Sequence, residues 1–211
     1  MAVRVLKDYP VELISVDSVM VYKDCDIGSA KPSNEVLRKY PHHLVNIESL
    51  ENIFTVSDFC RESLKLIDKI HDNEKIPLFV GGSMMYFKSL FHGIHDLPGK
   101  DHDYREELNH LKNNNPKNYL YSLLKNIDSV YANQIEENDH IRIIRALEIY
   151  KQSNIKLSDI FKETPKNGIK NNFDVHQFGI HLGRDIIHER IKTRLIEMFD
   201  QGLIEETINI L

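Results

Sequence analysis

The sequence contains few cysteines and no long apolar run. Its two cysteines, Cys25 and Cys60, form neither a disulfide framework nor a metal-ligand spacing, so we expect a reducing compartment and predict no metal site. No apolar run approaches the roughly 18 residues of a membrane helix. The N-terminal stretch MAVRVLKDYP also lacks the apolar core of a signal peptide. These absences predict a soluble, cytoplasmic protein with no membrane partner.

Basic residues are not in excess, because the formal net charge is −5 over 211 residues. This charge argues against a general, non-specific nucleic-acid binder. It is compatible with a local basic surface, since phosphate contacts depend on where Lys and Arg cluster. With 41% hydrophobic and 28% charged residues, the chain is long enough for one sizeable domain or for a core with an insertion.

Short apolar runs indicate buried parallel strands. Residues 11–16 and 76–80 are Val- and Ile-containing runs bounded by Pro, Asp or Gly, and residues 43–47 and 175–181 are weaker candidates. A helix is predicted after residues 43–47, where Thr55 and Asp58 form a plausible N-terminal cap. Alternating strands and helices predict an α/β layer.

From about residue 101 onward, the sequence pattern changes from strand-like to helical. Helical patterns occur in DHDYREELNHLK, PKNYLYSLLKN and NDHIRIIRALEIYKQS, and a long helix is predicted for GRDIIHERIKTRLIEMFDQG, ending near Gly202. We therefore predict three parts: residues 1–100 as the first part of the α/β core, 101–172 as an all-α insertion, and 173–211 as the return to the core.

Asp17 follows directly on the strand predicted for residues 11–16. The carboxyl ends of parallel strands are where open α/β sheets bind ligands, and a carboxylate there can act as a general base or hold a metal. Asp17 and Ser18 can equally cap the following turn, as Asp and Ser often do. Position alone favours the cap.

The Gly81-Gly82-Ser83 turn follows the strand predicted for residues 76–80 and precedes a helical pattern. Two glycines allow close backbone approach, and a new helix offers free N–H groups that suit a phosphate. A tight strand-to-helix turn without a ligand explains the same residues. No G-x-x-x-x-G-K-[ST] phosphate loop occurs in the sequence.

Two arginine pairs could grip phosphates. Arg142 and Arg145 share a helix face beside a stripe of Ile141, Ile144 and Leu147, although a solvated face that pairs with Glu148 fits the pattern better. Arg190 and Arg194 form a second pair at helical spacing. A guanidinium suits diphosphate because it donates two parallel hydrogen bonds.

Several long segments together resemble the tRNA dimethylallyltransferases, also called tRNA isopentenyltransferases or IPP transferases. They run in the family's order over nearly the whole chain: ELISVDSVMVYKDCDIGSAKP, PHHLVNI, IPLFVGGSMMYFKSLFHGI, NDHIRIIRALEIY and HQFGI with RDIIHERIKTR. The resemblance implies a P-loop NTPase-like parallel sheet with an all-α insertion that binds tRNA.

The family resemblance also implies an activity. These enzymes transfer the dimethylallyl group of dimethylallyl diphosphate to N6 of the adenosine that lies 3′ of the anticodon, in tRNAs reading codons that begin with U, with Mg²⁺ as cofactor. Asp17 would be the general base and Arg194 would hold the diphosphate. By the same resemblance, the residues that contact the tRNA anticodon stem-loop are Asp17, Ser18, Val19, Met20, Ser83, Arg105, Ile141, Arg142, Ile143, Ile144 and Arg145. Met20 stands where the family often has Gln, and Ser83 where it has Thr.

The sequence also departs from the family. The G-P-T-[AG]-S-G-K-T phosphate loop and the strand before it are missing, as is the family's C-terminal tRNA-binding region. We therefore expect a fragment, a mis-called start or a decayed gene product, with low stability and weak or no activity of its own. We also expect a monomer. Two alternatives are an enzyme that prenylates free adenine nucleotides and an inactive RNA-binding fragment.

Overall fold

The computed structural model describes residues 2–211, which form two compact units. The sheet unit consists of residues 2–93 and 168–211, and the helical unit consists of residues 94–167. The three functional parts predicted from the sequence, with limits at 100/101 and 172/173, stay a prediction. In the described part of the chain, no helix is both long and apolar enough to cross a membrane.

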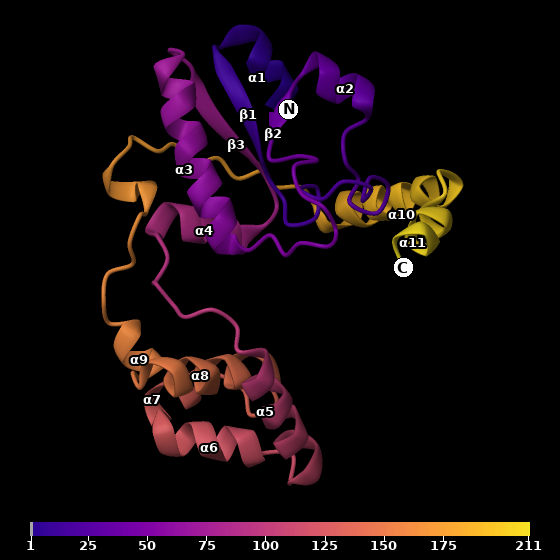
Figure 1. Ribbon diagram of the computed structural model, residues 1–211. Helices are drawn as coiled ribbons and strands as arrows, with labels where there is room; N and C mark the ends of the chain where they lie inside the picture. The colour runs from indigo at the N-terminus through magenta and orange to yellow at the C-terminus, as the bar shows by residue number, and fades with distance from the viewer. Residues whose placement is uncertain (1) are drawn as a thin grey trace. The chain divides into compact units, whose positions relative to one another are not determined.

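The sheet unit is built on a parallel sheet with the strand order β2-β1-β3. Along the chain it contains α1 (Ala2–Asp8), β1 (Val11–Val16), α2 (Asn34–Lys39), β2 (His42–His43), α3 (Val56–Asp72), β3 (Ile76–Gly81), α4 (Met84–His92), η1 (Ile169–Asn171), α10 (Arg184–Asp200) and α11 (Leu203–Ile210) (Figure 1). The α/β class predicted from the sequence is confirmed.

The central strand β1 is the most buried strand of this sheet. All its residues except Glu12 are buried, as expected for a strand with neighbours on both edges. Its register with β3 places Val16 opposite Gly81, so both strands end at the same edge of the sheet. Residues 11–16 and 76–80 are therefore confirmed as parallel strands, and they bring the two following turns together. The predicted burial is confirmed for β1 and wrong for β3, where Ile76 and Val80 are exposed.

The two weaker strand predictions need correction. Only His42 and His43 form β2, because the backbone turns at Leu44 and Asn46, where φ is 61° and 56°. The segment 175–181 forms no strand, and Phe178 is 89% exposed. Its apolar and polar residues alternate, but no strand of the described chain pairs with them, and alternation without a partner does not make a strand.

Helix α3 packs against both β3 and α4. Thr55 and Asp58 form the predicted capping box, with the Asp58 N–H donating to Thr55 Oγ1 and the Thr55 N–H donating to Asp58 Oδ2. The buried face of α3 includes Phe59 and Ile70. Phe59 contacts Tyr86 of α4, with ring centroids 4.7 Å apart, so the two helices pack through an aromatic pair.

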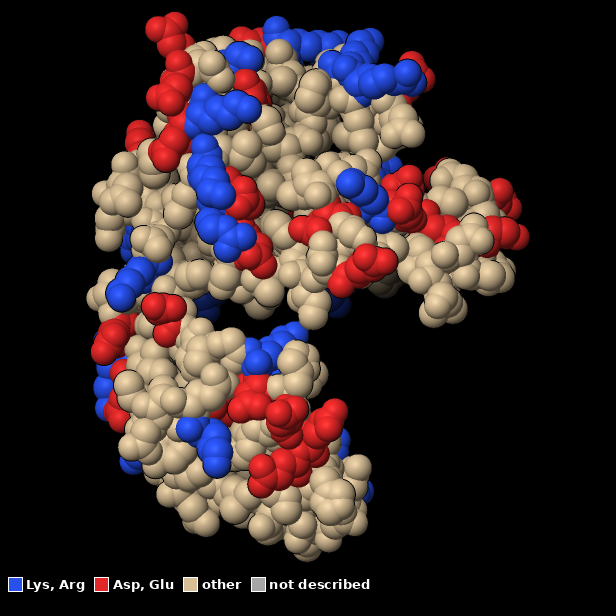
Figure 2. Space-filling view, in the orientation of Figure 1, with Lys and Arg blue, Asp and Glu red and all other residues tan. Residues whose placement is uncertain are grey.

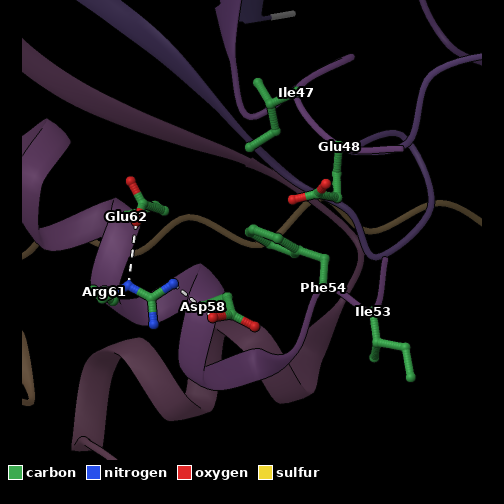
Figure 3. Close-up of a pocket in the computed structure, with 7 residues that line it drawn as sticks. All are labelled: Ile47, Glu48, Ile53, Phe54, Asp58, Arg61 and Glu62. Carbon is green, nitrogen blue, oxygen red and sulfur yellow. Dashed lines mark hydrogen bonds and ion pairs between the residues drawn. The ribbon is translucent and has the colours of Figure 1, made fainter. Parts of the chain in front are cut away.

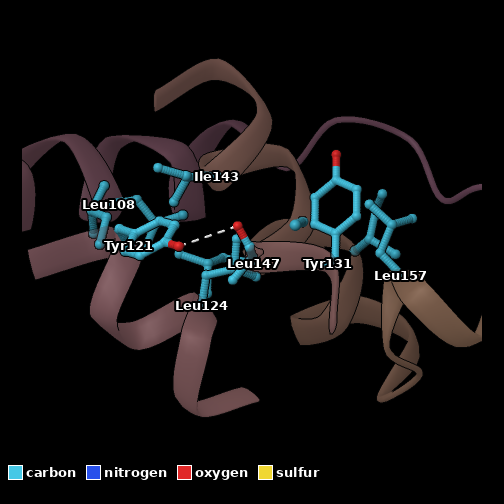
Figure 4. Close-up of a cluster of buried hydrophobic side chains, with 11 residues drawn as sticks. Leu108, Tyr121, Leu124, Tyr131, Ile143, Leu147 and Leu157 are labelled. Atoms are coloured by element: carbon cyan, nitrogen blue, oxygen red, sulfur yellow. Dashed lines mark hydrogen bonds between the residues drawn. The ribbon is translucent and has the colours of Figure 1, made fainter. Parts of the chain in front are cut away.

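The helical unit forms the all-α insertion that the sequence predicts. It contains α5 (His102–Asn114), α6 (Tyr119–Ile127), α7 (Ser129–Ala132), α8 (His140–Ser153) and α9 (Leu157–Ile160). One core joins these helices (Figure 4), consisting of Leu108, Leu120, Tyr121, Leu124, Tyr131, Ala132, Ile143, Ala146, Leu147, Ile149 and Leu157. Because this core is continuous, the helical unit has its own hydrophobic centre.

The apolar stripe predicted for α8 was partly wrong. Leu147 is buried and Ile144 is partly buried, but Ile141 is 85% exposed and Ile143 occupies the core instead. Residues 141, 143 and 144 are all isoleucines, so the sequence alone does not decide which face of the helix is buried. Because α8 packs against α5 and α6, the face that carries Ile143 is the buried one.

The last two helices end the described chain. The predicted long helix is α10, and Gly202 follows it with φ of 97°, which only glycine adopts easily. None of the residues of α10 or α11 is buried. These helices contact each other, and α11 touches the loop after β1 through Leu203 and Glu206.

Candidate functional site

Two turns meet at the carboxyl edge of the sheet. The first, Asp17–Met20, follows β1, and the second, Gly82–Ser83, joins β3 to α4. The Ser18 N–H donates to Ser83 Oγ at 3.2 Å, and the Ser83 N–H donates to the Val16 carbonyl at 3.2 Å. The structure thus brings together three residues that the sequence indicated separately: Asp17, Ser18 and Ser83.

Gly81 allows this close approach. A Cβ atom at Gly81 would lie 2.1 Å from the Val16 carbonyl oxygen, which no side chain can tolerate. A Cβ at Gly82 would meet no atom within 4 Å. Gly81 is therefore explained by strand packing, while Gly82 leaves open space beside the turn.

Asp17 caps the turn and still keeps one oxygen available. Its Oδ1 accepts hydrogen bonds from the Val19 N–H at 2.8 Å and the Met20 N–H at 3.1 Å. Its Oδ2 has no hydrogen-bond partner among residues 2–211, and the side chain is half-buried. The capping interpretation is confirmed, and it holds the carboxylate in one orientation with a free oxygen, as a general base requires.

Exposed apolar side chains lie within or directly after the two turns. Val19 is 43% exposed, and Met84 and Met85 at the start of α4 are also exposed. The Met20 sulfur lies 3.9 Å from Ser15 Oγ, so this side chain contacts the sheet. Met84 and Met85 were not among the predicted site residues.

In the helical unit, Arg105 and Arg145 surround one buried carboxylate. Glu148 is fully buried, and it accepts hydrogen bonds from Arg105 Nη2 at 2.8 Å, from the Asp101 N–H at 2.8 Å and from Arg145 Nη1. Arg145 Nη2 also donates to the Pro98 carbonyl at 2.7 Å. The expected pairing with Glu148 is confirmed for Arg145, but the expected solvated face was wrong, because Glu148 is buried between α5 and α8.

The electrostatics of Glu148 follow from these contacts. Burial alone would raise its pKa, but hydrogen bonds from Arg105, Arg145 and the Asp101 N–H outweigh burial and hold its pKa at about 2. Two guanidinium groups and one carboxylate leave the cluster with one net positive charge. Both arginine side chains are partly exposed, so this charge reaches the surface of the helical unit.

The other predicted RNA-contact positions lie on α8. Arg142 is mostly exposed and pairs with Asp139 at 2.7 Å, while Ile141 is exposed. Ile143 lies in the core and Ile144 packs against it, so neither presents a free side chain. A role of Arg105, Arg142 and Arg145 in RNA binding stays a prediction.

Arg190 and Arg194 lie on α10, and both side chains are exposed. Neither has a carboxylate within ion-pair distance among residues 2–211, so both guanidinium groups are available to an anion. Their spacing along the helix agrees with the predicted pair, and no hydrogen bond joins them to Asp17 in the described residues. The role of Arg194 at a diphosphate stays a prediction.

A cavity of about 230 Å³ lies beside the start of α3 in the sheet unit (Figure 3). Its lining includes Phe54, Asp58 and Arg61, and Arg61 pairs with Asp58 at 2.6 Å. None of the predicted site residues lines it. Its charged groups already satisfy one another, so it adds no group to the site.

No group of three or more His, Cys, Asp or Glu side chains in residues 2–211 is arranged to hold a metal ion. The described residues therefore do not form a metal centre of their own. The free oxygen of Asp17 is a single donor, which is too few for a protein-bound ion.

Comparison with known proteins identifies the family. The family model for IPP transferase matches residues 20–211. The chain belongs to the IPP transferase family. This match begins at Met20 and covers the loop after Asp17, the turn at Ser83, the helical unit and the helices α10 and α11.

Individual IPP transferases resemble the chain along most of its length. A protein of Psychrobacter arcticus named tRNA dimethylallyltransferase is 38% identical over 202 residues, which cover 95% of this chain and 49% of that protein. A protein of Syntrophotalea carbinolica named tRNA dimethylallyltransferase 1 is 36% identical over 206 residues, covering 98% of this chain and 65% of that protein. The chain therefore spans about half to two thirds of the length of these relatives.

Solved IPP transferase structures share the fold. A eukaryotic dimethylallyltransferase acting on tRNA has a TM-score of 0.79 and 27% identity, covering 97% of this chain and 50% of that one. The full-length tRNA isopentenylpyrophosphate transferase of Bacillus halodurans has a TM-score of 0.59 and 33% identity, covering 99% of this chain and 64% of that one. The P-loop-like α/β architecture predicted for the core agrees with these neighbours.

Proposed function

We propose that the chain carries out, or forms part of a protein that carries out, dimethylallyl transfer to tRNA. The acceptor is N6 of the adenosine 3′ of the anticodon, and the donor is dimethylallyl diphosphate. The observation that carries the proposal is the state of Asp17: two backbone N–H groups fix one carboxylate oxygen, and the other faces no partner in residues 2–211. The names of the relatives, and of the structural neighbour described as acting on tRNA, support the same reaction.

Asp17 suits the acceptor because an exocyclic adenine amine is a weak nucleophile. Its lone pair is delocalised into the ring, and a carboxylate that accepts a hydrogen bond from it raises the electron density on N6. The new N6–C bond forms as the C–O bond to diphosphate breaks. The proton on N6 passes to the free oxygen of Asp17, and diphosphate leaves with the bonding electron pair.

Arg194 is suited to bind the diphosphate of the donor, dimethylallyl diphosphate. Diphosphate gains negative charge as it leaves, and an exposed guanidinium with no ion-pair partner in residues 2–211 can stabilise this charge through parallel hydrogen bonds. We propose Mg²⁺ as a companion of the diphosphate, since magnesium commonly binds through substrate phosphates and water with few protein ligands. Magnesium supplies charge neutralisation when bound, and the described residues add no metal centre to it.

The proposed acceptor adenosine is part of a folded tRNA. A base next to the anticodon is stacked in a loop, and it must turn out of the stack to reach Asp17, which costs least in a single-stranded loop. We propose that Arg142 and the Arg105–Arg145 pair contact the RNA backbone, because phosphate contacts position an RNA without reading its sequence. Transfer to tRNA would place the protein in the cytoplasm.

A labelled-transfer assay tests the proposal. The purified chain is incubated with radiolabelled dimethylallyl diphosphate, Mg²⁺ and unmodified tRNA, and label in the tRNA is measured with and without excess AMP. Label in tRNA that AMP does not suppress is the expected result. Label transferred to AMP in preference to tRNA would indicate an adenine-nucleotide enzyme and contradict the proposal. Binding of tRNA without any transfer would contradict transfer by this chain alone.

A further inference from the structure

The loop after Asp17 is organised around one buried ammonium group. The Lys31 side chain is only 2% exposed. Its Nζ donates to the Tyr22 carbonyl at 2.7 Å, to Asp26 Oδ1 at 2.6 Å and to Asn46 Oδ1 at 2.7 Å. An ammonium has three donors, so Lys31 is fully satisfied, and removing it would leave three acceptors without a partner.

These contacts continue as far as Asp17. The backbone N–H of Asn46 donates to the Met20 carbonyl at 3.1 Å. The Met20 N–H in turn donates to Asp17 Oδ1 at 3.1 Å. Lys31 therefore connects to the carboxylate of Asp17 through three hydrogen bonds and the covalent structure of Asn46 and Met20.

The other end of this path lies on α11. Glu206 Oε2 accepts from the N–H groups of Asp26 at 2.9 Å and Ile27 at 2.7 Å, and Oε1 accepts from the Gly28 N–H at 2.9 Å. Three consecutive N–H groups that converge on one anion form a backbone nest. The fit is close, because a Cβ at Gly28 would lie 3.3 Å from Leu203 Cδ1.

The charge state of Glu206 agrees with this arrangement. Burial raises its pKa, but the N–H groups of Gly28, Ile27 and Asp26 lower it further than burial raises it, so the net shift is downward. Asp and Glu side chains gather over α10 and α11 (Figure 2), and Glu206 is the one whose carboxylate the loop 26–28 binds. Its neighbour Glu205 is exposed and makes no side-chain hydrogen bond in the described chain.

We propose that Lys31 and Glu206 are positioning residues for Asp17. Glu206 binds the backbone N–H groups of residues 26–28. Lys31 joins this segment to Asn46 through Asp26. The turn that orients the Asp17 carboxylate depends on both residues. The same contact docks α11, and with it the adjacent helix α10 that carries Arg194. The expected effect on catalysis rests on the proposed function. The mechanical link, meaning the hydrogen-bonded connection from Glu206 through Lys31 to Asp17, does not.

Amide hydrogen exchange followed by NMR tests the link without any need for activity. The variants are Glu206→Ala, Glu206→Gln and Lys31→Met, with Glu205→Ala as the matched control one residue away on the same helix. We expect Glu206→Ala to speed exchange of the amides of residues 26–28 by about tenfold or more, as loss of charge-assisted bonds does. The Val19 and Met20 amides, which bond to Asp17, should speed up about three- to tenfold. Glu205→Ala should change neither set.

Faster exchange at residues 26–28 with unchanged exchange at Val19 and Met20 would overturn the inference, since Glu206 would then be a tether of α11 only. If Glu206→Ala does not fold, Glu206→Gln decides, because Gln keeps one acceptor oxygen and should give a smaller change at the same amides. Lys31→Met should affect Val19 and Met20 more than Glu206→Ala does, because Lys31 is nearer to Asp17 along the path.

Kinetics separate a positioning role from a purely structural one. In the transfer assay, Glu206→Ala should lower kcat about tenfold with little change in the KM for tRNA, and Glu206→Gln should restore part of the loss. An equal fall in bound tRNA and in rate would contradict positioning. If the parent chain transfers no label while the Val19 and Met20 amides respond as expected, the proposed function fails and the mechanical link stands.

Discussion

The backbone N–H of Ser18 donates to Oγ of Ser83 at 3.2 Å, across 65 residues of sequence. This bond joins the turn that carries Asp17 to the turn that begins α4. Ser83 precedes α4 without capping it, because its hydroxyl oxygen accepts from Ser18 instead of from the helix. The site is therefore held by contacts between turns, on the rigid edge of a parallel sheet.

Replacing Ser83 should loosen this connection. Ser83→Ala removes the acceptor for the Ser18 N–H and should lower the free energy of unfolding by about 1 kcal/mol. Urea denaturation of both proteins measures the difference. Ser83→Thr keeps the hydroxyl and serves as the control, and an equal loss in the Thr variant would show that the hydrogen bond is not the cause.

The two adjacent glycines should respond differently to alanine. Gly81→Ala places a methyl group against the Val16 carbonyl and should cost about 2 kcal/mol or more, because the backbone of β1 must shift. Gly82→Ala meets no atom within 4 Å and should cost little. Thermal unfolding of the pair measures the contrast, and similar losses at both positions would contradict the close approach of β1 and the turn.

The stability of the chain should depend on pH through Glu148. Its pKa in the folded chain is about 2, below the ordinary 4.5, so the unfolded chain takes up the proton first as the pH falls. The stabilisation is complete above pH 4.5 and is lost as the pH falls from 4.5 through 2. Urea denaturation at several pH values across this range measures it.

Glu148→Gln should remove this component of the pH dependence and destabilise the chain by about 3 kcal/mol at neutral pH, since Arg105 and Arg145 lose their shared partner. Glu163→Gln is the control, because Glu163 is an exposed carboxylate of the same helical unit. An unchanged pH profile in the Glu148 variant would refute the buried cluster as its source.

Substitutions of Arg142 and Arg105 should affect tRNA binding and protein stability differently. Arg142 is 65% exposed in its side chain, so Arg142→Ala should weaken tRNA binding, reduce the salt dependence of binding by about one phosphate contact and leave stability unchanged. Arg105→Ala should destabilise the helical unit, because it leaves Glu148 short of hydrogen bonds. Filter binding at several salt concentrations, with melting curves, distinguishes the two effects. Unaltered binding by Arg142→Ala would argue against α8 as an RNA surface.

Local sequence patterns predicted the elements that depend on local physics. The apolar run at residues 11–16 and the Thr55–Asp58 capping box formed as expected, because burial and capping depend on neighbours in sequence. The pattern at residues 175–181 failed, because a strand also needs an edge to pair with. Asp17 was favoured as a turn cap on position alone, and its free Oδ2 could be found only in three dimensions.

Contacts between distant segments were not predictable from one sequence. Glu206 binds amides about 180 residues away, and nothing near Glu206 distinguishes it from Glu205. The burial of Lys31 was not predictable either, because lysine is common in solvated loops. Glu148 could be predicted as a partner of Arg145 by spacing, but its complete burial depends on how α5 packs against α8.

The most direct test of the account is the rate of dimethylallyl transfer to tRNA by Asp17→Asn. Asparagine keeps an oxygen that can accept the turn hydrogen bonds but cannot take a proton, so we expect the rate to fall about 10²- to 10⁴-fold with tRNA binding nearly unchanged. Asp24→Asn is the matched control, an exposed aspartate in the same loop with a positive φ that Asn also tolerates. Transfer by Asp17→Asn at the rate of the parent chain would contradict Asp17 as the base.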